Sequence, residues 1–98
     1  MVVQFRSATI EFDSTPSEIV QRESKAVVFD GAVSRADAAL KSFNVRSDPP
    51  QSVEIFQLQI SDISIVDNAV EVYVDFQLSA GGALVSCVTD IVVVADTE

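Results

Sequence analysis

The stretch "VEVYVDFQLSAGGALVSCVTDIVVVADTE", residues 70–98, joins two different hydrophobic patterns. Its first part is apolar at positions 70, 72, 74, 76 and 78, the alternation of a strand with one buried and one wet face. After a two-glycine turn, residues 83–95 are apolar at nearly every position. A run of that kind is typical of a strand covered on both faces. The sequence therefore predicts a sheet whose last strand is enclosed on both sides.

Residues 52–66, 69–79 and 83–95 each have the composition of a strand. Asp67-Asn68 and Gly81-Gly82 separate them, and both pairs tolerate the positive φ of two-residue hairpin turns. We therefore expect a C-terminal three-strand meander.

The first hairpin of this meander requires one extra residue at Ser61-Asp62. A turn at residues 67–68 pairs Ile65 with Val70, and an uninterrupted register would then place the polar residues 57, 59 and 61 on the core side. A bulge returns the apolar positions 56, 58 and 60 to the core. We expect Asp62 to stabilise the bulge rather than to act as a catalytic carboxylate.

A turn at residues 81–82 also fixes the two faces of the last strand. The core face carries apolar side chains at positions 85, 87, 91 and 93. The opposite face carries four more, which either the N-terminal segment or a second subunit must cover, because a large open apolar patch is unusual in a monomer. The residues favour neither cover over the other. The candidate interface residues are Leu84, Val88, Val92 and Val94.

The N-terminal half is less regular. Residues 2–12 predict a strand with a bulge near Ser7, because the apolar phase shifts from Val3 and Phe5 to positions 8, 10 and 12. Residues 15–18 ("TPSE") form a capping-box pattern that predicts the start of a short helix.

The middle of the chain leaves one assignment open. Residues 25–31 predict a strand that runs into a turn, and the two prolines within residues 46–52 predict a break. Residues 32–45 fit either a helical stripe or a strand with a phase slip after Leu40, and we prefer a strand from about Ala38.

Composition excludes several classes of partner. Fifteen acidic and six basic residues give a net charge of −9, and the basic residues are scattered, so nucleic acid and anionic membranes are poor partners. The single cysteine rules out an intrachain disulfide. We expect a cytoplasmic protein by default, since the sequence shows no signal peptide and no transmembrane stretch.

Few residues in the sequence suggest a catalytic or metal-binding role. Without histidine the chain lacks the commonest general base and metal ligand, and Cys87 is expected to lie inert in the core. A calcium site built from Asp67 and Asn68 with Asp30 or Asp48 is conceivable, but there is no DxDxDG loop, and the hairpin turn already explains the Asp-Asn pair. We therefore expect no catalytic residue, cofactor or metal.

One strand offers a candidate ligand face. Tyr73 stands among outward-pointing polar residues, where an amphipathic ring can stack on a sugar or anchor a protein contact. The two carboxylates beside it are expected to be solvated. The candidate ligand-face residues are Glu71, Tyr73, Asp75 and Gln77.

The segments "SDPPQSVEIFQLQI", "VEVYVDFQLSAGGALV" and "DIVVVADTE" resemble the H-type lectins, six-stranded β-sandwiches that form trimers and bind sugars. The resemblance covers about half the chain and implies a sandwich fold and a trimer-like assembly. The tryptophans usual in the last strands of that family are missing, and the resemblance assigns no sugar-binding residue.

Together these observations predict an all-β protein: one antiparallel β-sandwich of six or seven strands spanning residues 1–98, with at most one short helix. The leading functional hypothesis is a non-catalytic interaction or structural module that forms a homo-oligomer. The alternative is a lectin-like carbohydrate-binding protein, and an enzyme that relies on carboxylates alone comes third.

Overall fold

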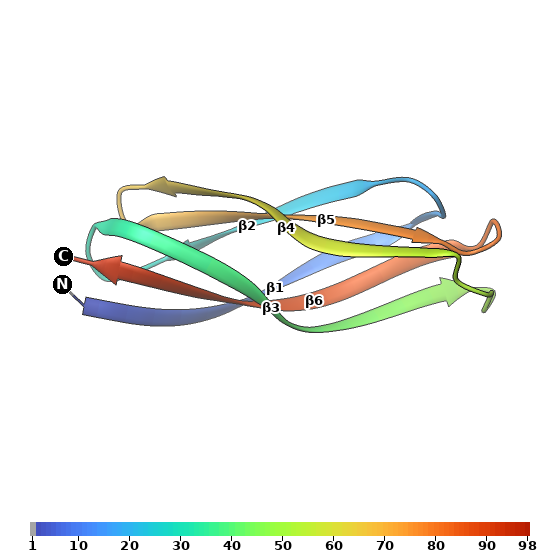
Figure 1. The fold of residues 1–98 in the computed structure, drawn as a ribbon, viewed down its shortest axis with the longest axis horizontal. Coiled ribbons are helices and arrows are strands. Elements are labelled where there is room, and N and C mark those ends of the chain that lie inside the picture. Colours follow the sequence, from blue (N-terminus) through green and yellow to red (C-terminus); the bar gives the residue numbers. More distant parts are fainter. Residues whose placement is uncertain (1) are drawn as a thin grey trace.

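The computed structural model describes residues 2–98, which form two three-stranded antiparallel sheets (Figure 1). Sheet A has the strand order β1-β6-β3 and sheet B the order β2-β5-β4. The described residues contain no helix and so no helical segment that could span a membrane. The strands are β1 (Val2–Pro16), β2 (Gln21–Val28), β3 (Val33–Asp48), β4 (Ile55–Val66), β5 (Ala69–Ser79) and β6 (Leu84–Thr97).

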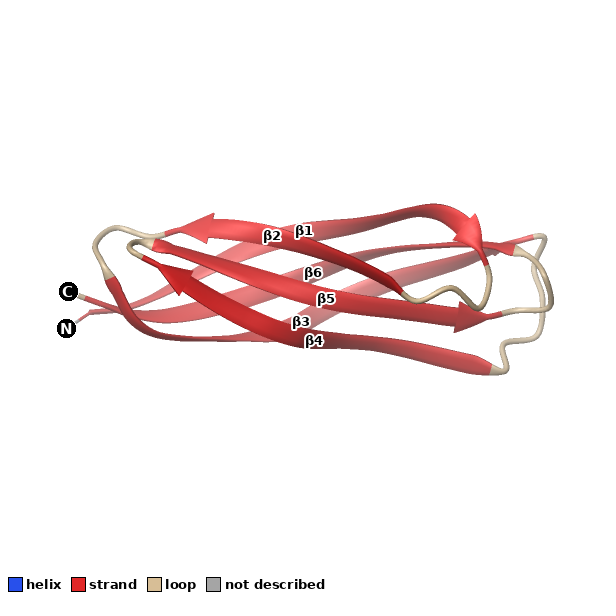
Figure 2. Ribbon diagram, turned by 90° about the horizontal axis from the view of Figure 1, so that it is seen from above, coloured by secondary structure: helices blue, strands red, loops and turns tan. Residues whose placement is uncertain are grey.

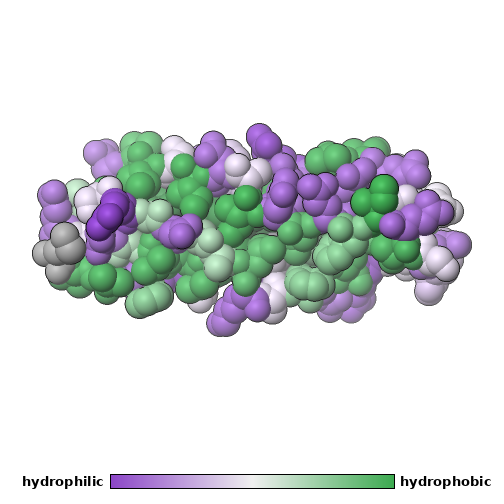
Figure 3. All heavy atoms as spheres, viewed as in Figure 1, coloured by the Kyte–Doolittle hydropathy of each residue, from purple (hydrophilic) through white to green (hydrophobic). Residues whose placement is uncertain are grey.

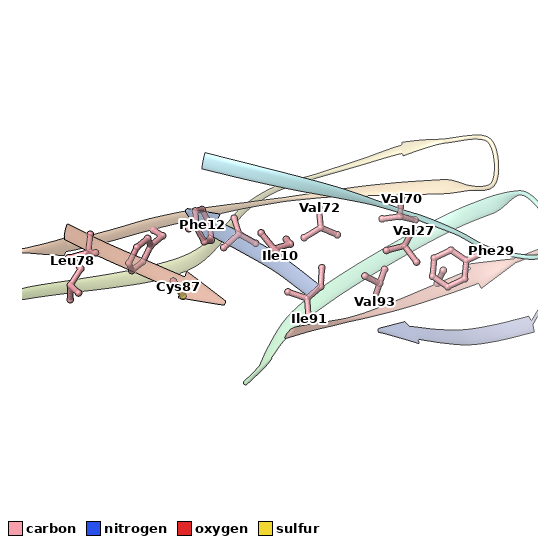
Figure 4. Packing of buried hydrophobic residues seen from close by; sticks show 14 of the residues in the cluster. Ile10, Phe12, Val27, Phe29, Val70, Val72, Leu78, Cys87, Ile91 and Val93 are labelled. Carbon is pink, nitrogen blue, oxygen red and sulfur yellow. The ribbon is translucent and has the colours of Figure 1, made fainter. Parts of the chain in front are cut away.

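The core lies between the two sheets, and the central strands β5 and β6 supply most of it. Alternate residues of β5 from Val70 to Leu78 are buried, as are alternate residues of β6 from Val85 to Thr97. Figure 4 shows Val70 and Val72 of β5 facing Ile91 and Val93 of β6. Phe12 and Phe76 join the sheets, with their ring centroids 5.2 Å apart. The expected all-β class is confirmed.

The molecule is a rod, because its strands are long and run along one axis. The Cα positions extend over 49 × 18 × 17 Å. A strand rises about 3.3 Å per residue, so the 14 residues of β6 nearly span the long dimension by themselves. Four of the five connections carry the chain from one sheet to the other, and only β4 and β5 are joined as a hairpin (Figure 2).

The bulge expected in the first hairpin is confirmed. Ile60 pairs with Val74 and Asp62 with Tyr73, so Ser61 is the extra residue. Beyond the bulge Leu58 pairs with Phe76, and the apolar side chains of β4 return to the core side. The Asp62 carboxylate accepts a hydrogen bond from the Ile63 amide at 2.8 Å, which stabilises the local turn of the chain.

The expected three-strand meander is wrong beyond β5. The strand β6 pairs with β1 and β3 rather than with β5. Gly81 and Gly82, with φ values of 57° and 81°, turn the chain from sheet B into sheet A. Hydrophobic alternation did not distinguish the two arrangements, because either one places Val85, Cys87, Ile91 and Val93 on the core side.

The bulge expected near Ser7 is also wrong. The pairing of β1 with β6 is continuous from Val2 to Phe12 and shifts only between Phe12 and Thr15. The apolar phase changes because Val3 and Phe5 lie on the outer face of sheet A, whereas the later apolar residues point inward.

Residues 15–18 do not begin a helix, contrary to the capping-box pattern. They carry the chain from sheet A to sheet B, where the Ser17 amide donates to the Ala83 carbonyl and the Glu18 amide to the Leu78 carbonyl, each at 3.0 Å. The Glu18 carboxylate accepts from the Ser79 hydroxyl at 3.2 Å instead of reaching back to a helix start. Tertiary hydrogen bonds therefore override the local capping signal.

Residues 33–48 are strand β3, which settles the open assignment in favour of a strand with a phase slip. The slip falls between Leu40 and Ser42, where Lys41 is the extra residue. Ala36 and Ala38 before the slip and Val45 after it all pack against the core.

The last strand is buried on one face only. It is the central strand of sheet A, with β1 and β3 beside it, so the N-terminal segment does not lie over its outer face. Leu84 and Val88 are exposed there, and Val92 and Val94 are half-buried. Of the two covers that the sequence left open, the N-terminal segment is therefore excluded, and within the described residues the outer face of β6 is uncovered.

Deleting Ser61 should destabilise the fold by at least about 3 kcal/mol, because without the bulge Ile60, Leu58 and Phe56 must leave the core side or the hairpin must lose its pairing. Urea unfolding followed by circular dichroism measures the change. Ser61→Ala is the matched control: it keeps the residue and loses only hydrogen bonds to Tyr73 and Asp75, so it should cost about 1 kcal/mol. Equal stability of the two variants would contradict the register.

Candidate functional site

The outer face of β6 carries the four residues that the sequence proposes as an interface. Val94 lies between Phe5 of β1 and Asp37 of β3, and Val92 lies between Ser7 and Ala39. Leu84 and Val88 lie on the same face toward the opposite end of the strand. All four thus point away from the core, as expected.

Val92 and Val94 belong to a larger apolar patch at the end of sheet A where the termini lie. Phe5 is 65% exposed and Val3 56% exposed, and both lie on the outer face of β1. A shallow hollow of about 130 Å³ lies between Phe5, Val92, Val94 and Ala39. We call this surface the outer patch; it consists of Val3, Phe5, Ala39, Val92 and Val94.

A charged residue divides the outer face of sheet A into two parts. Asp90 lies between the outer patch and Val88, and its carboxylate accepts hydrogen bonds from the Thr9 hydroxyl at 2.7 Å and the Ser42 hydroxyl at 3.1 Å. These hydrogen bonds, together with the charge of Lys41, hold the pKa of Asp90 below its ordinary value. The structure therefore groups Val92 and Val94 but separates them from Leu84 and Val88.

Sequence reasoning missed Val3 and Phe5 as part of this surface. The signal was present, because their phase is opposite to that of the buried residues Ile10 and Phe12. An apolar outer face and a bulge produce the same phase change in a sequence. Only the pairing with β6 separates the two explanations.

The candidate ligand face on sheet B is polar, and its side chains are bonded to one another. Glu71, Tyr73, Asp75 and Gln77 all point outward from β5. The Tyr73 hydroxyl donates to the Glu71 carboxylate, which also accepts from the Ser24 hydroxyl at 3.2 Å. The Gln77 amide donates to the Glu18 carbonyl at 3.3 Å.

Asp75 is less solvated than the sequence suggests. Its side chain is only 14% exposed, and it pairs with Arg22 through bonds of 2.7 and 3.2 Å. Hydrogen bonding to Arg22 lowers the pKa of Asp75, with a smaller contribution from the Ser61 hydroxyl. The carboxylate is therefore held ionised as a structural partner.

The remaining candidate residues have structural partners. Cys87 is buried in the core, and burial raises the pKa of its thiol, so it is a poor nucleophile. The Asp67 carbonyl accepts from the Val33 amide and the Asn68 side chain donates to the Phe29 carbonyl, which ties the hairpin to the loop before β3. Among residues 2–98 no three acidic or cysteine side chains gather as a metal site would require.

Comparison of the chain with protein-family models, with curated proteins and with solved structures finds no match.

Tyr73 is the only tyrosine and the chain has no tryptophan, so its ionisation can be followed by ultraviolet absorbance without interference. The hydrogen bond to Glu71 raises the pKa of Tyr73. We expect Glu71→Gln to move the titration toward lower pH. Because the folded-state pKa is the higher one, the stabilising contribution is complete below about pH 10 and is lost as the pH rises through the folded-state value.

Ser24→Ala is the control for this titration, because it removes the other partner of Glu71 and leaves the carboxylate beside Tyr73. Its curve should stay close to that of the wild type. Identical curves for the wild type and Glu71→Gln would contradict the assignment.

Proposed function

We propose that this protein is a non-catalytic structural module, a β-sandwich that associates with copies of itself. The observation that carries the proposal is the uncovered outer face of β6. A central strand with valines on its outer face, beside an exposed phenylalanine, is suited to burial against another protein surface.

The contrast between the two sheets supports this proposal. The middle of the outer face of sheet B is lined by hydrogen-bonded polar groups such as Tyr73, Glu71 and Asp75, although Val28 and Val66 are exposed at one end of that face. The corresponding face of sheet A presents Phe5 and Val94 to solvent. The polar middle of sheet B is therefore stable in contact with water, whereas burial of Phe5 and Val94 against another protein surface would be favourable.

The absence of catalytic groups from the sequence also favours a structural role. The chain contains no histidine, and its single cysteine is buried. The two carboxylates that flank Tyr73 on β5, those of Glu71 and Asp75, are engaged by Tyr73 itself and by Arg22. A general acid or base needs a carboxyl group free to exchange its proton with a substrate.

The outer patch is small, which limits what it contributes. Burial of apolar surface yields about 25 cal/mol per Å², while the loss of translational and rotational freedom on association costs about 4–15 kcal/mol. The patch alone therefore supports weak association that depends on concentration. A tight assembly requires further buried area.

Carbohydrate binding at the ligand face is the second candidate, favoured by the Tyr73 ring among hydrogen-bonding groups and by the resemblance to H-type lectins. A glycan array with and without calcium tests it. Binding that is lost in Tyr73→Ala would support this function, and no binding in either condition would count against it.

For the leading proposal, Val92→Asp should raise the dissociation constant of the oligomer at least tenfold while the monomer stays folded, because the new carboxylate must be desolvated in the interface. Light scattering after size exclusion and sedimentation equilibrium measure the assembly.

Val66→Asp is the matched control, since it places the same charge at an exposed valine on the outer face of sheet B. It should leave the assembly unchanged. A wild-type protein that is monomeric at millimolar concentration would contradict self-association altogether.

A further inference from the structure

The loop between β2 and β3 contains the pair Asp30-Gly31, which lies outside both strands. Asp30 is the only aspartate of the sequence that precedes a glycine, and no asparagine precedes one. Its side chain is 95% exposed. The pair therefore places an accessible carboxyl group beside a backbone amide that no side chain shields.

The fold requires glycine at position 31. Its φ is 101°, a conformation that residues with a Cβ rarely adopt. A Cβ at this position would also lie 2.7 Å from the Glu98 carbonyl oxygen, which leaves no room for a larger residue. The unhindered amide after Asp30 is therefore a consequence of how the segment around Glu98 packs against this loop.

The two groups that could react with each other are only weakly engaged. The Asp30 carboxylate contacts the Arg6 guanidinium at 3.5 Å, which is long for an ion pair with a hydrogen bond. The Gly31 amide makes no backbone hydrogen bond with the rest of residues 2–98. Neither contact holds the carboxyl group away from the amide nitrogen.

One hydrogen bond restrains the peptide group between Asp30 and Gly31. The Gln4 side-chain amide donates to the Asp30 carbonyl at 2.8 Å and to the Thr97 hydroxyl at 2.7 Å. Opposite rotations about ψ of Asp30 and φ of Gly31 turn this peptide group while the neighbouring residues stay in place, and glycine permits the change in φ. Breaking the bond to Gln4 therefore frees the Gly31 nitrogen to approach the Asp30 carboxyl carbon.

From these observations we propose that Asp30-Gly31 is a site of spontaneous backbone modification, at which Asp30 isomerises to isoaspartate at a rate that the Gln4 hydrogen bond limits. The Gly31 nitrogen attacks the Asp30 carboxyl carbon, the amide proton and the carboxyl hydroxyl leave as water, and a five-membered succinimide closes. Water then adds to one of the two ring carbonyls. Addition at the former side-chain carbonyl restores aspartate, whereas addition at the former backbone carbonyl leaves Gly31 joined through the side chain of Asp30.

The isoaspartyl product adds one atom to the backbone between two anchored residues. The Phe29 amide donates to the Asn68 carbonyl and the Val33 amide to the Asp67 carbonyl, each at 2.8 Å. The carbonyl group that Gln4 binds becomes part of a free carboxylate outside the chain. Because the added length must be taken up between Phe29 and Val33, we expect the Val33 amide to exchange with solvent faster in the product.

The test incubates the folded wild type at neutral pH and physiological temperature. Isoaspartate is then mapped by tryptic digestion, labelling with a methyltransferase specific for isoaspartyl residues, and mass spectrometry. Asp37 is the matched internal site, because Ala38 carries a Cβ and its amide donates to the Asp37 carboxylate at 2.8 Å. Arg35 lies between the two sites, so trypsin places them on separate peptides. Label at residue 30 should exceed label at Asp37 at least about tenfold, because only glycine leaves the attacking amide unshielded.

Two variants test the roles of the individual groups. Gln4→Ala should speed the accumulation of isoaspartate, because it removes the hydrogen bond that restrains the peptide group. Asp30→Glu keeps the negative charge and should remove the label, because its longer side chain would have to close a six-membered ring, which forms more slowly.

The wild type decides the assignment even if a variant fails to fold. Absence of isoaspartate from residue 30 would overturn the proposal, and so would equal accumulation at Asp37. A folded Gln4→Ala variant that accumulates the product at the wild-type rate would contradict the restraint, and unchanged exchange of the Val33 amide in the isolated product would contradict the loss of anchoring. The reaction is intramolecular, so these outcomes are independent of self-association.

Discussion

The inner faces of β5 and β6 pack against each other across the two sheets, and the other strands depend on that contact. Val72, Val74 and Phe76 on one side and Ile91 and Val93 on the other are completely removed from solvent. Thr89, the polar residue at the centre of this layer, is satisfied because its hydroxyl donates to the Ser42 carbonyl at 2.8 Å. With no disulfide among the described residues, burial of these β-branched and aromatic side chains must offset the loss of chain entropy on folding.

Once the two central strands cover each other, the remaining surfaces differ in how they meet water. The middle of the outer face of sheet B and the edge where β1 meets β2 are polar, whereas the outer patch of sheet A and the edge where β3 meets β4 are apolar (Figure 3). A smaller apolar area, Val28 and Val66, lies at one end of the outer face of sheet B. A rod built from long strands has a large surface for its volume. The fold itself does not require apolar residues at these exposed positions, because polar side chains would fit there as well. The apolar surfaces are the ones suited to contact with another protein.

Hydrophobic alternation predicted which residues of β4, β5 and β6 face the core, and it predicted the Ser61 bulge because an uninterrupted register would have buried glutamines. In β1 it was misleading, because Val3 and Phe5 lie on the outer face. It did not predict the sheet to which β6 belongs. A two-glycine turn serves equally as a hairpin and as a corner between sheets, and the same side chains are buried in either case.

The surface features were predicted only in part. Val92 and Val94 were identified from the alternation of β6, but Phe5 became their neighbour only through the pairing of strands that are distant in sequence. The same holds for Phe43 and Phe56, whose contact crosses from one sheet to the other. The local signal at residues 15–18 was misleading because hydrogen bonds to Ala83 and Leu78, far along the chain, determine the backbone there.

The most direct test of the central claim is a nuclear Overhauser experiment on the folded protein. The account predicts strong contacts between the rings of Phe12 and Phe76, together with cross-strand backbone contacts from β6 to β1 and β3. Cross-strand backbone contacts between β5 and β6, without the contact between the two rings, would contradict it, because they would place these strands side by side in one sheet.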